Sequence, residues 1–190
     1  ALLATPAAAV DIQTVTSPSG INAWLVEDHE LPFTALEIWF QGGSSLDQPG
    51  KRGAVSLMTS LLEEGAGDRN AVAFSEARES LAASFGFEAS NDVLTVSAQF
   101  LTENRDASVA LLKDALTHPR FDPDAVERVR GQLLSVIESE ARDPSSIASE
   151  QLSALAYGAD PYGSSPNGTR DSVAALTRDD LVAAHAATMA

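Results

Sequence analysis

Residues 53–67, GAVSLMTSLLEEGAG, contain the pattern from which the fold of the chain is predicted. Leu57, Leu61 and Leu62 recur at the spacing that places side chains on one side of an α-helix, and Val55 and Met58 lie close by. Two glycines follow, and glycine is the residue at which helices most often end. The stretch therefore predicts a core helix that stops at the glycines.

Three hydroxyl side chains lie between these apolar positions. Ser56, Thr59 and Ser60 are spaced i, i+3 and i+4, so they share one face of the predicted helix. The simplest interpretation is structural, because small hydroxyls are tolerated in a half-buried helix when they donate to the carbonyl groups four residues earlier.

On the N-terminal side, the pattern alternates with a period of two. The segments VDIQTVT (10–16), INAWLVE (21–27) and TALEIWF (34–40) read as three strands. The residues between the first two, SPSG (17–20), have the chemistry of a tight turn. These two strands are therefore predicted to form a hairpin.

On the C-terminal side, a second helix is expected over 71–84. It is followed by the strands GFEAS (86–90) and VLTVSAQFL (93–101) and by four helices, over 105–118, 122–141, 145–157 and 177–189, with a short helical turn near 169. This order predicts an α+β fold with a mostly antiparallel sheet covered on one face by helices. No strand follows the last helix to complete the sheet, so we expect this sequence to be a fragment of a two-domain subunit.

The composition limits the classes of partner. The chain of 190 residues has 27 acidic and 12 basic residues, a formal net charge of −15, which repels nucleic acid and anionic lipid. A solvated acidic exterior explains this charge, and an electropositive peptide or partner is the alternative. No apolar run is long enough for a membrane span, and there is no cysteine for a disulfide or thiolate metal site.

The first nine residues, ALLATPAAA, resemble the tail of an export signal. They combine a short apolar piece with small residues in an A-x-A pattern. We therefore divide the chain into a signal-peptide remnant or disordered lead over 1–9 and one domain over 10–190. A periplasmic or exported location is the corresponding expectation.

Four fragments in succession carry a family resemblance. In chain order they are GINAWLVEDHELPFTALEIWFQGGSSLDQPGKRGAVSLMTSLLEEG (20–65), AFSEARESLAASFGFEAS (73–90), ALTHPRFDPDAVERVRGQLLSVIESEARDP (115–144) and YGADPYGSSPNGTRDSVAALTRDDL (157–181). Together they resemble the N-terminal domain of the M16 metallopeptidases, the group that contains insulysin, pitrilysin and the mitochondrial processing peptidase. The resemblance covers residues 12–188.

The resemblance implies where a zinc site would lie in active members. Their helix bears H-x-x-E-H, in which two histidines bind zinc and the glutamate is the general base. Here Ser56 and Ser60 take the histidine positions and Thr59 the glutamate position. The third ligand, a glutamate about 76 residues further on in the family, falls at Val136. Because neutral hydroxyls and a valine cannot offset the dehydration of Zn²⁺, we expect no catalytic residue, no metal and no cofactor in this chain.

The remaining candidate residues point to no chemistry. The three histidines have no i, i+4 partner among them, and the acidic pairs are typical of solvated helix faces or of helix N-termini. The stretch GAGDR (65–69) lacks the lysine and hydroxyl of a phosphate-binding loop. The histidines are His29, His118 and His185, and the acidic pairs are Asp122 with Asp124, Glu138 with Glu140 and Asp179 with Asp180.

The resemblance then implies a function. Members without ligands form one wall of a peptide-binding chamber, and a zinc-bearing H-x-x-E-H partner performs the hydrolysis. An unfolded peptide would add as a strand along Phe87, Glu88, Ala89 and Ser90. Two alternatives stay open: a purely structural scaffold subunit of a larger complex, and an active zinc metallopeptidase with relocated ligands.

Overall fold

The computed structural model describes residues 11–189, which fall into two compact units divided between Pro32 and Phe33. The prediction of a lead over residues 1–9 lies outside the described residues. The first unit contains β1 (Gln13–Thr16) and β2 (Asn22–Leu25), which pair antiparallel around the turn at 17–20. The predicted hairpin is therefore present.

The second unit contains the other elements. Its strands are β3 (Phe33–Gln41), β4 (Gly65–Ala66), β5 (Arg69–Asn70), β6 (Ser84–Ala89) and β7 (Val93–Leu101). Its α-helices are α1 (Ala54–Ser60), α2 (Ala71–Ser80), α3 (Arg105–Thr117), α4 (Pro123–Glu140), α5 (Pro144–Tyr157), α6 (Arg170–Ala174) and α7 (Arg178–Thr188). Single 3₁₀ turns occur at η1 (Ser44–Leu46), η2 (Thr102–Asn104) and η3 (Pro161–Gly163).

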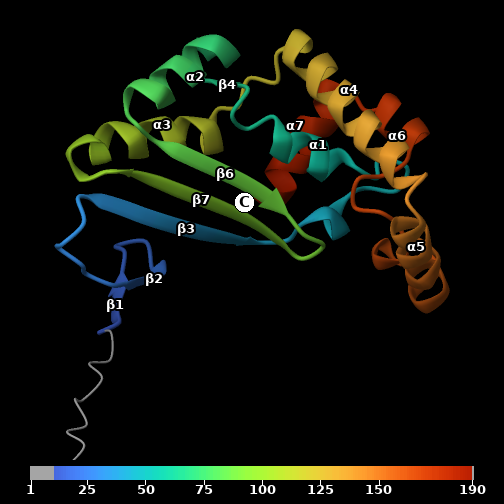
Figure 1. The fold of residues 1–190 in the computed structure, drawn as a ribbon, viewed down its shortest axis with the longest axis horizontal. Helices are drawn as coiled ribbons and strands as arrows, with labels where there is room; N and C mark the ends of the chain where they lie inside the picture. Colours follow the sequence, from blue (N-terminus) through green and yellow to red (C-terminus); the bar gives the residue numbers. More distant parts are fainter. Residues whose placement is uncertain (1–10, 190) are drawn as a thin grey trace, which may run out of the picture. The chain divides into compact units, whose positions relative to one another are not determined.

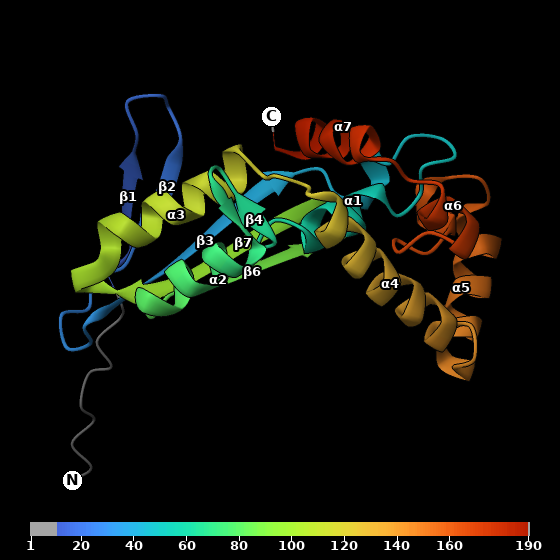
Figure 2. The ribbon, with the colours of Figure 1, turned by 90° about the horizontal axis from the view of Figure 1, so that it is seen from above.

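The main sheet of this unit has three antiparallel strands in the order β3-β7-β6. Figures 1 and 2 show α2 and α3 lying over one face of this sheet, while α1, α4, α6 and α7 gather at one end of it. The alternation read from the sequence is confirmed on β7, where Leu94, Val96, Ala98 and Phe100 are buried. The α+β class with helices on one face of an antiparallel sheet is thereby confirmed.

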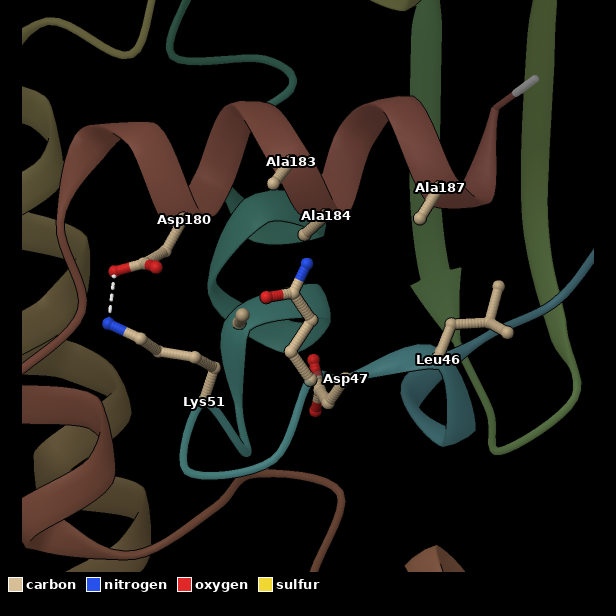
Figure 3. Close-up of a pocket in the computed structure, with 9 residues that line it drawn as sticks. Leu46, Asp47, Lys51, Asp180, Ala183, Ala184 and Ala187 are labelled. Carbon is tan, nitrogen blue, oxygen red and sulfur yellow. Dashed lines mark hydrogen bonds and ion pairs between the residues drawn. The ribbon is translucent and has the colours of Figure 1, made fainter.

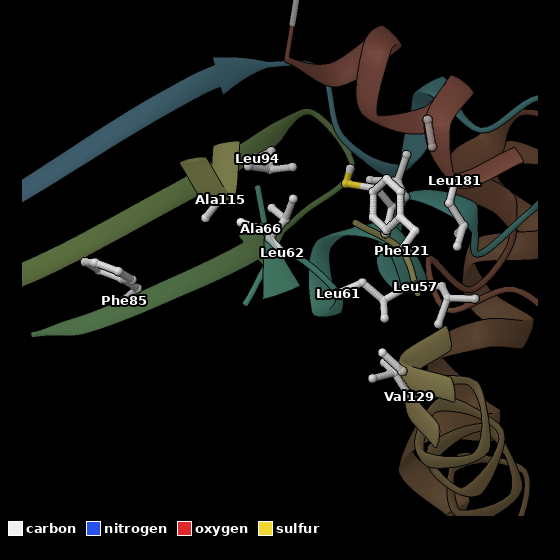
Figure 4. Close-up of a cluster of buried hydrophobic side chains, with 14 of the residues drawn as sticks. Leu57, Leu61, Leu62, Ala66, Phe85, Leu94, Ala115, Phe121, Val129 and Leu181 are labelled. Atoms are coloured by element: carbon white, nitrogen blue, oxygen red, sulfur yellow. The ribbon is translucent and has the colours of Figure 1, made fainter. Parts of the chain in front are cut away.

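The core is built around α1. Val55, Leu57 and Met58 are fully buried, as is Leu62 just after the helix end, and Leu61 is nearly so. This helix packs against β6, α4 and α7, so its apolar side chains meet those of the sheet and of the C-terminal helices (Figure 4). Burying a side chain of this size stabilises the fold by about 1.5–3 kcal/mol. The prediction of a core helix is confirmed.

Two helix ends differ from the sequence prediction. α1 ends at Ser60, and the glycines that follow belong to the β4–β5 hairpin, which the sequence analysis missed. α2 ends at Ser80, four residues before the predicted end, because the backbone N–H groups of Ala82 and Ala83 donate to the carbonyls of Glu79 and Arg78. This is a Schellman end, in which Ala82 takes the left-handed position (φ 49°) that glycine usually occupies.

Within residues 11–189, no helix is long and apolar enough to cross a bilayer.

Candidate functional site

The N-terminus of α1 is held by a carboxylate from the preceding loop. Asp47 Oδ2 accepts from the backbone N–H of Gly53, and Oδ1 accepts from that of Val55, each at 2.8 Å. The Asp47 side chain is only 1% exposed. Burial raises the pKa of Asp47. This effect outweighs that of the two N–H groups and Arg52, which lower the pKa. The carboxylate satisfies two of the four N–H groups that a helix leaves open.

A second contact fixes the same loop to α7. Lys51 Nζ lies 2.8 Å from Asp180 Oδ2, and Asp180 also accepts from the backbone N–H of Thr177 at 2.7 Å. Figure 3 shows Ala183 and Ala184 of α7 beside this loop, where their small side chains allow a close approach. The start of α1 is therefore held by two contacts, the Asp47 carboxylate and the ion pair between Lys51 and Asp180.

The three hydroxyls of α1 are already engaged in hydrogen bonds. Thr59 Oγ1 donates to the Val55 carbonyl at 2.8 Å, and Ser60 Oγ donates to the Ser56 carbonyl at 3.0 Å, which is the i−4 pattern expected from the sequence. Ser56 is different, because its Oγ donates to the carbonyl of Pro166 at 2.8 Å. Ser56 thus joins α1 to a loop more than a hundred residues away in the chain.

Arg52 fastens the same loop. Its guanidinium donates to the carbonyls of Ser165 at 3.0 Å, Pro161 at 2.9 Å and Ser164 at 3.1 Å, and also to that of Ser44. A planar group with five N–H donors can serve several carbonyls at once. The loop over 161–167 is therefore held against the N-terminal half of α1.

This loop also reaches the end of α4. Asn167 Nδ2 donates to Glu140 Oε1 at 3.0 Å. Val136 is one turn before Glu140 on the same helix face, and its side chain is 46% exposed. Ser56 is thus connected, through the loop over 161–167 and Glu140, to the face of α4 that carries Val136.

An open cleft of about 240 Å³ lies beside this junction. It is formed by α5, by the end of α4 and by the loop over 161–167, and most of its lining groups are hydroxyls, amides and carboxylates. The lining residues are Asn91, Glu140, Ser146, Ser149, Glu150, Ser153, Tyr162, Ser164, Ser165, Pro166 and Asn167. The Tyr162 hydroxyl donates to Asp92, and this hydrogen bond raises the pKa of Tyr162.

The donor set does not fit a zinc ion. Thr59 and Ser60 direct their hydroxyl protons to helix carbonyls, and Val136 offers no donor atom. His118 Nδ1 contacts the Thr117 hydroxyl, and His185 Nε2 contacts the Leu116 carbonyl. Zinc sites require imidazole, thiolate or carboxylate ligands, and Ser56, Thr59, Ser60 and Val136 offer none of these.

The sequence pattern of Insulinase (Peptidase family M16) matches residues 23–170. The chain belongs to the M16 peptidase family. The family resemblance read from the four fragments is therefore confirmed.

Three relatives illustrate the similarity. A Helicobacter pylori protein named non-peptidase homolog YmxG is 30% identical over 155 residues, which is 82% of this chain and 36% of that protein. The β subunit of the mitochondrial-processing peptidase of Neurospora crassa is 25% identical over 183 residues, covering 95% of this chain and 38% of the subunit. A crystal structure described as a peptidase M16 inactive domain from Pseudomonas fluorescens superposes with a TM-score of 0.87 at 30% identity, covering 93% of this chain and 43% of that one.

The chain therefore spans 36–43% of the length of these M16 relatives. The assignment of Ser56, Thr59, Ser60 and Val136 as the motif-equivalent positions remains a prediction. Sequence reasoning missed Asp47 and Arg52 altogether. A signal was present, because Arg52 is one of only 12 basic residues and comes just before the core helix, but its four carbonyl partners could not be read from the sequence.

Proposed function

We propose that this chain is part of a non-catalytic M16 subunit, which forms one wall of a peptide-binding chamber together with a zinc-bearing partner. This proposal rests on the hydrogen bonds of the α1 hydroxyls. They donate to carbonyl groups, at the positions where the resemblance places the zinc ligands and the general base. A helix engaged in this way contributes packing and leaves hydrolysis to another chain.

Two of the similar proteins support the non-catalytic part of the proposal. One is named a non-peptidase homolog and the other an inactive domain, and both are 30% identical to this chain. The similarity to a protein named as a subunit of a processing peptidase supports an arrangement of more than one subunit. An exported location belongs to the same proposal.

The edge of β6 supplies a surface for an extended peptide. Among the described residues, β6 pairs only with β7, and the hairpin turn closes with the Ser90 N–H donating to the Val93 carbonyl at 2.9 Å. Hydrogen-bonded pairs alternate along an antiparallel ladder, so Glu88 bonds to β7 while Phe87 and Ala89 direct their backbone groups to the free edge. The Ser90 carbonyl already accepts from the Ser44 N–H, so we place peptide addition at Phe87 and Ala89.

The subunit role is tested by zinc analysis and reconstitution. The purified protein should contain no stoichiometric zinc and should cleave no peptide alone. Mixed with an H-x-x-E-H partner from the same cell, it should form a complex whose cleavage rate exceeds that of the partner alone. Zinc at one ion per chain, or chelator-sensitive cleavage by this protein alone, would contradict the proposal. A complex with no effect on cleavage would favour the scaffold alternative.

The peptide edge is tested with a proline. Ala89→Pro removes an N–H that faces the free edge, a place where proline is tolerated, and should weaken binding of an extended peptide without unfolding the domain. Ala89→Val is the matched control, because it changes the side chain but keeps the N–H. Equal peptide affinity for the two variants would refute strand addition at this edge.

A further inference from the structure

Asparagine is followed directly by glycine at one place in the sequence, Asn167-Gly168. The other four asparagines precede alanine, aspartate or arginine. Because glycine has no side chain, nothing hinders its backbone nitrogen from approaching the side-chain amide of the asparagine before it. Asparagine is a chemically labile residue, and it is most labile when glycine follows it. This dipeptide is therefore the position at which the chain can most readily react with itself.

The folded structure holds both reacting groups in hydrogen bonds. Asn167 Nδ2, the nitrogen that would leave, donates to Glu140 Oε1 at 3.0 Å. The Gly168 N–H, the group that would attack, donates to the Ser165 carbonyl at 3.1 Å. Gly168 is buried, whereas Asn167 is partly exposed and lines the open cleft. Water can therefore reach the Asn167 side chain, but attack by Gly168 requires that these two hydrogen bonds first break.

A carboxylate at position 167 would be unfavourable in the folded structure. The Asn167 amide donates to Glu140, whereas an ionised carboxylate can only accept hydrogen bonds. Replacing the amide would leave two negative groups within hydrogen-bond distance, in a cleft that Glu150 also lines. Like charges at this separation repel each other. The contact between the loop over 161–167 and α4 would then become repulsive.

The backbone of this dipeptide has no room for an extra atom. A Cβ at Gly168 would lie 2.3 Å from the Arg52 carbonyl oxygen, and one at Gly53 would lie 2.5 Å from the Asn167 carbonyl oxygen. The two main chains are thus in close contact at both residues of the dipeptide. Isoaspartate routes the main chain through the side-chain carbon and lengthens it, so its formation would force these segments apart.

We propose that Asn167 is a deamidation site whose reaction releases the loop over 161–167 from α4. The Gly168 nitrogen forms a bond to Asn167 Cγ, the Cγ–Nδ2 bond breaks, and the amide nitrogen leaves as ammonia with the proton of the Gly168 N–H. Water then opens the resulting succinimide at either of its carbonyl carbons. The products are aspartate and isoaspartate, and the reaction needs no oxidant or reductant.

The fold controls the rate of this reaction. Because the succinimide forms only when the loop opens, the rate of deamidation depends on how often the loop leaves α4. Because the amide is not restored, each event is permanent. The modification requires no partner and no peptide, so it goes beyond the proposed function.

The first test follows deamidation by peptide mapping with mass spectrometry, after incubation of the purified protein in a mildly alkaline buffer. Deamidation at Asn167 should be at least about ten-fold faster in guanidinium chloride than in the folded protein. Glu140→Ala, with its fold checked by circular dichroism, should accelerate the reaction at least about three-fold because it frees the amide. Glu150→Ala is the matched control, because it removes a carboxylate from the same cleft but leaves the partner of Asn167 in place. Its rate should stay within about two-fold of the wild type.

The second test uses the product and an exchange of charge. Asn167→Asp should lower the midpoint of thermal unfolding by about 2–4 °C through repulsion by Glu140. Adding Glu140→Gln should restore most of that loss, because the new amide then donates to the new carboxylate. Added salt should reduce the loss in the single variant, since salt screens the repulsion.

Three results would overturn the inference. The first is a folded Glu140→Ala variant that deamidates at Asn167 no faster than the wild type, or not at all. The second is an Asn167→Asp variant as stable as the wild type, and the third is a loss of stability in that variant that Glu140→Gln does not restore. None of these measurements involves zinc, a peptide or a partner, so their failure would leave the proposed function unaffected.

Discussion

Asp47 accepts the backbone N–H of Val55 at 2.8 Å, eight residues ahead in the chain, so the start of the core helix is defined by a side chain from the preceding loop. The same carboxylate holds Gly53, whose φ of +94° lets the chain turn into the helix. The loop over 47–53 and the helix therefore form one structural unit, with Arg52 attaching the loop over 161–165 to it.

Removing this carboxylate should destabilise the fold. Asp47→Ala leaves two helix N–H groups and the Arg52 guanidinium without their partner, and we expect a loss of about 2–3 kcal/mol in the free energy of unfolding. Urea unfolding followed by circular dichroism measures the loss. Asp106→Ala, at an 88% exposed side chain, should change it by less than about 0.5 kcal/mol. Equal effects at the two positions would contradict the capping role.

The pH dependence follows from the raised pKa of Asp47. A carboxyl whose pKa is higher in the folded than in the unfolded state binds its proton more tightly when folded, so its contribution to stability falls as the pH rises from the unfolded pKa, near 3.8, through the folded one. The difference in unfolding free energy between the wild type and Asp47→Asn, which cannot titrate, should therefore shift in favour of the wild type as the pH is lowered from 7 toward 4. A shift in the opposite direction would mean that the N–H donors dominate over burial.

Two glycines with the same backbone angle give a matched comparison. Gly50 and Gly168 both have φ +77°, but a Cβ at Gly50 meets nothing within 4 Å, while one at Gly168 would lie 2.3 Å from the Arg52 carbonyl oxygen. Gly50→Ala should cost about 1–2 kcal/mol, the penalty of a left-handed non-glycine residue. Gly168→Ala should cost at least about 2 kcal/mol more, because the loop and α1 must separate. Thermal unfolding of both variants measures the difference, and equal values would mean that the loop is free to move.

The sequence predicted the fold where one local pattern decides the structure. Leu57, Leu61 and Leu62 identified the core helix, and alternation identified the strands, because burial on one face leaves a period in the residues. The β4–β5 hairpin was missed because strands of two residues carry no period. The end of α2 was misplaced because Ala82 takes a conformation that its residue type disfavours.

The candidate site was predictable only in part, for a related reason. Ser56, Thr59 and Ser60 were found because helical spacing is local. The donation from Ser56 to Pro166 and three of the four carbonyl partners of Arg52 depend on segments about a hundred residues apart. Nothing in either segment alone specifies the pairing.

Installing the ligands tests whether α1 and α4 retain the geometry of a metal site. In a variant with Ser56→His, Ser60→His and Val136→Glu, two imidazoles would lie at i and i+4 on α1, and a carboxylate would extend from the half-exposed position on α4. We expect the triple variant to bind on the order of one zinc ion per chain, measured by calorimetry and elemental analysis. Because the Ser56 contact to Pro166 is lost, the variant should also unfold at a slightly lower urea concentration without zinc.

The matched control for this variant carries Val136→Gln with the same two histidines. A neutral amide oxygen binds Zn²⁺ more weakly than a carboxylate of the same shape. The zinc affinity of this control variant should therefore be at least about ten-fold weaker than that of the triple variant. Equal affinity in the two variants would show that position 136 does not reach the metal, and the alignment of Val136 with the third ligand would then be wrong. Failure of both to bind zinc, with the fold intact by circular dichroism, would show that the positions on α1 and α4 do not converge.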